Sequence, residues 1–449
     1  NMGVMVPCQE ILAKAKEENA DIIGLSGLIT PSLEEMQYVA AEMEKDPYFR
    51  ERQMPLLIGG ATCSRVHTAV KIAPNYSGPV VYVPDASRSV GVAQGLLSEQ
   101  AAKFIADLNT DYAKVREQHA NKKQTPMWTL AQARANKTPI DWAKGVPAAP
   151  KFIGRRVFKN YDLAEIAQYI DWGPFFQTWD LAGPFPAILD DEVVGEQARK
   201  VYADGQAMLQ KIIDGRWVTA NAVLGLYPAN SVNDDDIALY TDESRSQVAM
   251  TWRGLRQQTE KHMIDGVMRP SRCLADFVAP TGQDHVGVFA VTAGIGADKR
   301  AAAFEAAHDD YSAIMLKSLA DRLAEALAEC LHKKVRTDLW GYAAGEALSN
   351  EELIAEKYQG IRPAPGYPAC PDHSAKKAMF ELLQCEDIGM GLTESLAMTP
   401  AASVSGFYIA HPEAQYFNVG KVGDDQVQDL AQRSGVEVKD LQRLLAPNL

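Results

Sequence analysis

Cysteines are few in this sequence, and no two of them form a Cys-x-x-Cys motif. The six are scattered over 449 residues at Cys8, Cys63, Cys273, Cys330, Cys370 and Cys385. This spacing argues against a disulfide framework and is typical of a reducing compartment, so we expect a cytoplasmic protein. The chain also has no apolar run of about 18 residues, and we therefore expect no membrane span.

Positive charge is scarce as well. The 45 lysines and arginines are outnumbered by 58 acidic residues, and the formal net charge of −13 argues against nucleic-acid binding, which needs a basic face. No Gly-x-Gly-x-x-Gly follows a first strand and no Walker motif is present, so sites for dinucleotides and nucleoside triphosphates are poorly supported. The string TAGIGADKR (292–300) has the strand-Gly-x-Gly-helix form of Rossmann methyltransferases, but no β-α-β pattern surrounds it.

Short apolar runs alternate with helical segments over residues 1–100. Strands are expected at 20–27, 54–60 and 78–84, each ending in Gly or Pro, and Thr30 is expected to begin a helix as its N-cap. This alternation predicts an α/β domain with a doubly wound parallel sheet.

The loops after these three strands contain mainly small and hydroxyl side chains. In an open parallel sheet, a ligand binds outside the carboxyl ends of the strands. Small side chains there allow a flat ligand to approach the backbone, and Ser26 and Thr30 can hydrogen-bond its polar rim. Tight turns in any such domain would use the same residues, so the composition of these loops leaves both interpretations open.

The pattern changes after a charged helix expected at 101–120. We interpret the polar, Pro-rich segment 122–150 as a linker and the beginning of a second domain. The later segments predict a larger α+β domain over 122–449. Helices are expected at 161–176, 190–213, 242–263 and 311–336, and strands at 222–229, 285–294 and 403–411.

The string RPAPGYPACPDH (362–373) predicts a stiff, extended loop, because each of its four prolines fixes φ and lacks an N–H. Arg362 opens the loop and is a candidate to bind a carboxylate, since a rigid loop loses little entropy on binding. A surface salt bridge is the ordinary alternative. Cys370 and His373 form only half of a tetrahedral metal site, and no other ligand pair lies near them in sequence, so we expect no metal site.

Two further segments contain candidate binding residues. Asp171 is expected to end the helix that begins at 161, where a carboxylate opposes the helix dipole, and such a break of a local rule marks a candidate site. An exposed Asp before a turn is the alternative. Tyr416 and Phe417 follow a His-Pro turn and are expected to open a strand.

Several long strings, among them ADIIGLSGLITPSLEEM, PLLIGGATCSRVHTAVKIAPNYSG, RPAPGYPACPDH and LTESLAMTPAASVSGFYIAHPEAQYF, resemble the carboxyl-terminal part of cobalamin-dependent methionine synthases. The resemblance covers essentially the whole chain. It implies that residues 1–121 are most of a flavodoxin-like cobalamin-binding domain, and that 122–449 are the activation domain that binds S-adenosylmethionine (AdoMet). The family's Asp-x-His-x-x-Gly motif, whose histidine is the lower ligand of cobalt, is absent, so we expect that domain to be incomplete at its N-terminus.

The resemblance also implies the cofactors and their contacts. The positions that match cobalamin contacts are Ser26, Thr30 and Ala86. The positions that match AdoMet contacts are Asp171, Arg362, Tyr416 and Phe417, and Glu325 and Glu356 match acidic positions near that ligand. No side chain is expected to act as an acid, base or nucleophile, because the sulfonium is already an activated methyl donor. The zinc of the parent enzyme belongs to a module outside this segment.

The function implied is that of a methyltransferase segment, which supports the reductive methylation of cob(II)alamin to methylcobalamin. Its electron donor would be flavodoxin or a flavodoxin-like reductase. The modules for homocysteine and methyltetrahydrofolate are not in this sequence, so we expect no complete methionine synthesis from it alone. Two alternatives stay open: a corrinoid carrier or sensor without transfer activity, and a stand-alone AdoMet-dependent methyltransferase that uses 292–300.

Overall fold

The protein forms two compact units. The computed structural model describes residues 1–3, 5–29, 32–120 and 126–449, apart from the side chains of Ala86 and Ser87. The first unit contains residues 1–126 and 442–447, and the second contains 127–441 and 448–449. The predicted boundary at 121–122 falls in a segment outside the described residues.

The first unit contains a parallel sheet of three strands in the order β1-β2-β3. Ile23 pairs with Leu56, and Leu56 pairs with Val80, so the three strands expected from the sequence are all present in parallel register. Leu56 and Ile58 are fully buried between the helices and the sheet. The elements are α1 (Cys8–Glu17), β1 (Ile23–Ser26), α2 (Ser32–Lys45), α3 (Pro47–Arg52), β2 (Leu56–Gly59), α4 (Arg65–His67), β3 (Val80–Tyr82), α5 (Ala86–Leu97) and α6 (Ala101–Ala120).

The second unit is built on an antiparallel sheet in the order β13-β10-β5-β6-β7, and β4 also pairs with β5. Its strands are β4 (Gly154–Phe158), β5 (Thr219–Val232), β6 (Asp236–Tyr240), β7 (Val248–Arg253), β8 (Met263–Ile264), β9 (Val267–Met268), β10 (His285–Ile295), β11 (Gly391–Leu392), β12 (Met398–Thr399) and β13 (Ser403–Tyr408). Its helices are α7 (Leu130–Ala135), α8 (Leu163–Ala167), α9 (Gly173–Gln177), α10 (Gly195–Gly215), α11 (Ala297–Ala306), α12 (Asp310–Lys334), α13 (Asn350–Ile354), α14 (Ala375–Leu383), α15 (Asp424–Ser434) and the beginning of α16 (Val438–Leu444).

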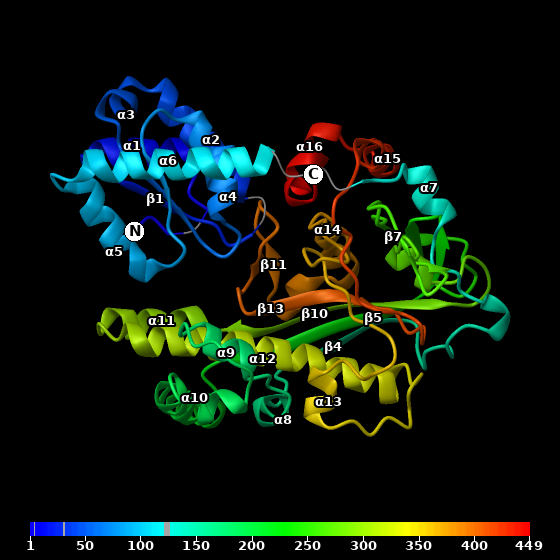
Figure 1. Ribbon diagram of the computed structural model, residues 1–449. Helices are drawn as coiled ribbons and strands as arrows, with labels where there is room; N and C mark the ends of the chain where they lie inside the picture. The colour runs from blue at the N-terminus through cyan, green and yellow to red at the C-terminus, as the bar shows by residue number, and fades with distance from the viewer. Residues whose placement is uncertain (4, 30–31, 121–125) are drawn as a thin grey trace. The chain divides into compact units, whose positions relative to one another are not determined.

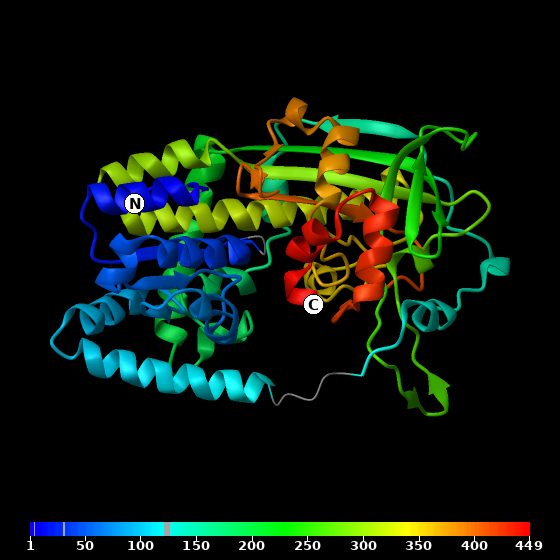
Figure 2. The ribbon, with the colours of Figure 1, turned by 90° about the horizontal axis from the view of Figure 1, so that it is seen from above.

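Helices cover both faces of this sheet. Figure 1 shows α10, α11 and α12 on one face and α14 on the other, and Figure 2 shows α12 running along the sheet. Asp309 begins α12 as an N-cap by accepting a hydrogen bond from the Ser312 N–H at 3.0 Å. The long helix expected at 311–336 is therefore confirmed. In the described ranges, no helix combines the length and apolarity needed to span a bilayer.

Two predictions about this unit are wrong. The helix expected at 242–263 is replaced by strand β7, in which Met250 and Trp252 alternate inward and pair with β6. That two-residue period is the pattern of a half-buried strand, and it spans only the middle of the segment 242–263. The helix expected at 161–176 is divided into α8 and α9, with residues 168–172 between them.

Candidate functional site

The proline-rich loop extends the edge of the sheet beside β13. Ile361 and Ile409 exchange both backbone hydrogen bonds, at 2.9 and 3.0 Å, and the Pro363 carbonyl accepts from the Phe407 N–H at 2.9 Å. The prediction of an extended loop is thus confirmed for its first residues. Arg362 follows directly from this pairing, so the sheet fixes the position of its backbone.

The loop then turns back on itself around His373. The Gly366 N–H donates to the Cys370 carbonyl at 2.8 Å, and Gly366 has a φ of +96°. A Cβ at this position would lie 2.2 Å from Cε1 of His373, so only glycine fits over the buried imidazole. Cys370 is buried as well. Among the described residues, no group of three or more His, Cys, Asp or Glu could hold a metal ion, and both side chains contribute to packing of the loop.

The buried imidazole predicts an acid-sensitive fold. Burial, assisted by the positive charge of Lys376, lowers the pKa of His373 from 6.5 to about 4. Between these values the unfolded chain binds more protons than the folded chain, so stability is present above pH 6.5 and falls as the pH decreases toward 4. The loss approaches about 3 kcal/mol in the free energy of unfolding.

Urea unfolding across this pH range measures the effect. We expect His373→Gln to reduce the pH dependence, because the substituted side chain has no proton to gain. His308→Gln is the matched control, since His308 is exposed. An unchanged pH dependence in His373→Gln would show that other groups cause the acid sensitivity.

The Arg362 side chain is held by acceptors from α12 and from the segment after α13. Its Nη2 lies 2.8 Å from Oε2 of Glu329. Its Nη1 donates to Nδ1 of His332 at 3.2 Å and to the Tyr358 hydroxyl at 3.1 Å. The side chain keeps 20% of its surface exposed, so Arg362 is anchored by these acceptors and is not fully closed off from solvent.

A second layer of buried groups fixes these acceptors. Arg336 forms a two-pronged pair with Glu346, at 2.7 and 2.8 Å, and lies 3.9 Å from Oε1 of Glu329. His332 stacks on Tyr408, with ring centres 5.2 Å apart. Burial, with the charges of Arg336 and Arg362, holds the pKa of His332 well below its usual range. The imidazole is therefore neutral, and its Nδ1 is free to accept from Arg362.

Tyr416 reaches the same cluster, although it does not open a strand as expected. It lies in an irregular segment, because the chain after β13 turns away from the sheet at His411. Its hydroxyl accepts from the Arg362 N–H at 3.0 Å and lies 3.1 Å from the Tyr358 hydroxyl. Phe417 also lies outside any strand, and it packs instead against the apolar cluster under α14.

Glu325 and Glu356 both lie within electrostatic reach of Arg362. Glu325 is one turn before Glu329 on α12, and burial raises its pKa, an effect that Arg322 and Arg362 oppose. Burial also raises the pKa of Glu356, and Arg362 again opposes the shift. Glu356 adopts a φ of +56° just after α13. The structure therefore brings Arg362, Tyr416 and these two carboxylates together.

Asp171 is placed differently from the prediction. It does not end a helix: it lies between α8 and α9, and its Oδ1 accepts from the Gly173 N–H at 2.9 Å. The helix-dipole argument for this residue is therefore wrong. Among the described residues, no hydrogen bond or ion pair joins Asp171 to Arg362. Its neighbour Ile170 accepts from Asn350, the first residue of α13, at 3.4 Å, and a ligand contact of Asp171 stays a prediction.

The sequence reasoning missed Glu329, His332, Arg336 and Tyr358. Three of them were visible as a pattern, because Glu325, Glu329, His332 and Arg336 follow one another at spacings of four, three and four residues. Such a polar stripe on an otherwise apolar helix indicates a buried polar face. Tyr358 gave no comparable signal.

The strand ends of the first unit approach each other closely. Ser26 ends β1 opposite Gly59, and the Gly27 N–H donates to the Gly59 carbonyl at 2.8 Å. Gly60 has a φ of +104°, and a Cβ there would lie 2.3 Å from the Gly27 carbonyl oxygen. Ser26 is exposed at this edge. Thr30 lies outside the described residues; Ala86 begins α5, and its side chain is likewise outside them.

The segment 292–300 is not a Rossmann loop. Gly296, with a φ of +91°, does join β10 to α11. Strand β10, however, is antiparallel to both of its neighbours, β5 and β13, whereas a Rossmann loop follows a strand of a parallel sheet. The Gly-x-Gly segment does join a strand to a helix, as its pattern indicated. The antiparallel sheet around it excludes the alternative of a Rossmann methyltransferase that uses 292–300.

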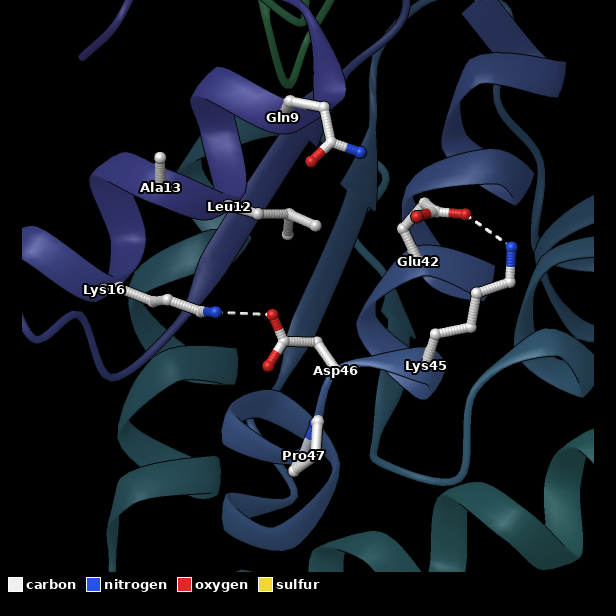
Figure 3. A pocket seen from close by; sticks show the side chains of 8 residues that line it. All are labelled: Gln9, Leu12, Ala13, Lys16, Glu42, Lys45, Asp46 and Pro47. Atoms are coloured by element: carbon white, nitrogen blue, oxygen red, sulfur yellow. Dashed lines mark hydrogen bonds and ion pairs between the residues drawn. The ribbon is translucent and has the colours of Figure 1, made fainter.

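A surface hollow of the first unit lies between α1 and α2 (Figure 3). Its charged side chains pair with one another: Lys16 with Asp46 at 2.5 Å, and Lys45 with Glu42 at 2.6 Å. The residues that line it are Gln9, Leu12, Ala13, Lys16, Glu42, Lys45, Asp46 and Pro47. None of them is a predicted site residue, and we assign no ligand to this hollow.

Comparison with known proteins gives two matches. A family model described as "Vitamin B12 dependent methionine synthase, activation domain" matches residues 162–435. A solved structure described as the MetH reactivation domain bound to AdoHcy is 50% identical, with a TM-score of 0.69. That match covers 72% of this chain and 99% of the other chain.

Proposed function

This chain belongs to the family of the vitamin B12-dependent methionine synthase activation domain, and we propose from this that its second unit binds AdoMet at Arg362. The solved relative is described as bound to AdoHcy, which is AdoMet without its transferable methyl group. The observation that carries the proposal is the partly exposed Arg362 side chain, whose guanidinium is anchored by Glu329 and Tyr358. A planar guanidinium held in this way suits the carboxylate of an amino acid.

The charges around Arg362 fit AdoMet as a whole. The ligand has one carboxylate and two positive groups, the ammonium and the sulfonium. Arg362 is already paired with Glu329 at 2.8 Å, and Glu325 and Glu356 add two carboxyl groups nearby. The site therefore offers one cation for the carboxylate and two acidic side chains for the positive groups. We keep Asp171, Tyr416 and Phe417 as proposed ligand contacts.

For the first unit we propose a flavodoxin-like, doubly wound cobalamin-binding domain over residues 1–121, followed by the activation domain over 122–449. The parallel sheet and the close approach of Gly27 and Gly60 support this, because they place small residues at the carboxyl ends of the strands. Ser26, Thr30 and Ala86 would contact the corrin there. Bound cobalamin would supply the cobalt that receives an electron and a methyl group.

The wider function follows from the family. As part of methionine synthase, a methyltransferase, the chain works with other modules of the parent enzyme. We propose a cytoplasmic location, a flavodoxin-like electron donor, and reductive methylation of cobalamin as the reaction supported. A pure corrinoid carrier is the competing function, and AdoMet binding by residues 122–449 alone would exclude it.

Replacing Arg362 by alanine tests the proposal. We expect the affinity for AdoMet to fall roughly 10- to 100-fold, because a charge-assisted contact to the carboxylate is lost. Isothermal titration of the purified chain measures the dissociation constant. Arg300→Ala is the matched control, since that guanidinium stacks over Trp217 at 4.0 Å. Unchanged AdoMet affinity in Arg362→Ala would refute the assignment of the site.

A further inference from the structure

We infer that Glu329 is a positioning residue, which holds the Arg362 guanidinium from behind so that its outer edge can receive the ligand carboxylate. This inference rests on the proposed function of Arg362. Glu329 projects from α12, and only 8% of its side chain is exposed. Its two oxygens face two different arginines, Arg362 at 2.8 Å and Arg336 at 3.9 Å.

Glu329 is also held by burial and by a second positive charge. Arg336 is fully buried, and its Nε and Nη2 donate to the two carboxylate oxygens of Glu346. One of the two cations beside Glu329 is therefore fixed by a separate pair. Burial and the positive charge of Arg336, at 3.9 Å, favour this place for the Glu329 carboxylate, and its close pair with Arg362 at 2.8 Å then defines where the guanidinium lies.

The remaining contacts of Arg362 determine which of its hydrogens are left for a ligand. Both hydrogens of Nη1 are used, by His332 and by Tyr358. Nη2 uses one on Glu329. Among the described residues, Nε and the second hydrogen of Nη2 have no partner. The three acceptors thus direct the guanidinium and leave part of its donor set available.

Two roles for Glu329 can be distinguished by this geometry. A competing carboxylate would have to release Arg362 when a ligand arrives, and would need an exposed position to move into. Glu329 is nearly buried and faces Arg336 as well, so leaving Arg362 would not bring it to water. Glu325, one turn earlier on α12, is the more exposed carboxylate of the pair. The geometry therefore favours positioning over competition.

The test compares AdoMet with decarboxylated AdoMet, which has no group for Arg362 to bind. In the 449-residue chain, Glu329→Gln should weaken AdoMet binding about 10-fold or more, and binding of the decarboxylated analogue by less than about two-fold. The ratio of the affinity for AdoMet to the affinity for the decarboxylated analogue should therefore fall. In an Arg362→Ala background, Glu329→Gln should cause no further loss of AdoMet affinity.

Glu165→Gln is the matched control, because it removes a carboxylate that pairs with Lys334 of the same helix α12, at 3.1 Å, and that contacts neither Arg362 nor Arg336 among the described residues. It should leave the affinity ratio unchanged. If Glu329→Gln does not fold, Glu329→Asp replaces it; that variant withdraws the carboxylate by one methylene and should also reduce the ratio.

Two outcomes would overturn the inference. Tighter AdoMet binding in Glu329→Gln would make Glu329 a competitor, and equal weakening of both ligands would make its role purely structural. Failure of the proposed function itself looks different: the unsubstituted chain would then bind no AdoMet, or would bind both ligands equally well.

Discussion

Replacing Arg256 by methionine is expected to lower the free energy of unfolding of the second unit by about 3–5 kcal/mol. Arg256 is fully buried, with Nε 2.7 Å from Asp235 and Nη2 2.7 Å from Asp276. Its Nη1 also donates to the Ser271 carbonyl at 2.7 Å. The substitution leaves Asp276 buried without its ion pair and deprives Asp235 of one of its two arginines, the other being Arg134.

Chemical unfolding followed by circular dichroism measures this loss. Lys317→Met is the matched control, because it removes a cation from a pair with Glu305 in which both side chains are about half exposed. Exposed pairs contribute little, so the control should unfold almost like the unsubstituted chain. A loss below about 1 kcal/mol for Arg256→Met would show that water or rearranged side chains reach the two aspartates.

The ion pairs around Arg256 and Asp235 also join segments that are far apart in the sequence. Arg134, from α7, pairs with Asp235 at 2.7 Å and with Asp429 of α15 at 2.8 Å. The segment 122–150, which we interpreted as a linker and the beginning of the second domain, is therefore more than a connection. From residue 127 onward, this segment is fastened to the sheet of the second unit by ion pairs between residues far apart in sequence.

Local patterns were sufficient where one segment determines its own structure. The three strands of the first unit, the helix α12 and the extended proline-rich loop all follow from periodicity or from proline. Prediction failed where the structure of a segment depends on its contacts with segments distant in sequence. Strand β7 exists because β6 lies beside it, and Tyr416 lies at Arg362 because the chain turns away from the sheet after β13.

The candidate site shows the same limit. Arg362 could be selected from its loop, but its partner Glu329 lies 33 positions earlier, and nothing local connects the two. The composition does not reveal which charged side chains form buried pairs. A net charge of −13 would be the same whether Arg362 were exposed or paired with Glu329. Their positions require the fold.

Gly406→Ala is expected to cost about 3–5 kcal/mol and to weaken AdoMet binding, through the backbone that holds Arg362. A Cβ at Gly406 would lie 2.6 Å from the Pro363 carbonyl oxygen and 3.0 Å from the ring of Phe289. Phe289 is fully buried, so neither neighbour can move aside cheaply. The loop would have to separate from β13, with loss of the hydrogen bond between Phe407 and Pro363.

In Gly406→Ala, the loss of stability and the loss of AdoMet affinity are both expected to come from separation of the loop from β13. Because Arg362 directly precedes Pro363, any separation of the loop from β13 shifts the guanidinium relative to Glu329 on α12. Gly345→Ala is the matched control, since a Cβ there meets no atom within 4 Å. Denaturant unfolding and AdoMet titration should both change in Gly406→Ala and neither in the control. Reduced stability with full AdoMet affinity would mean that the acceptors on α12 position Arg362 without the help of the sheet edge.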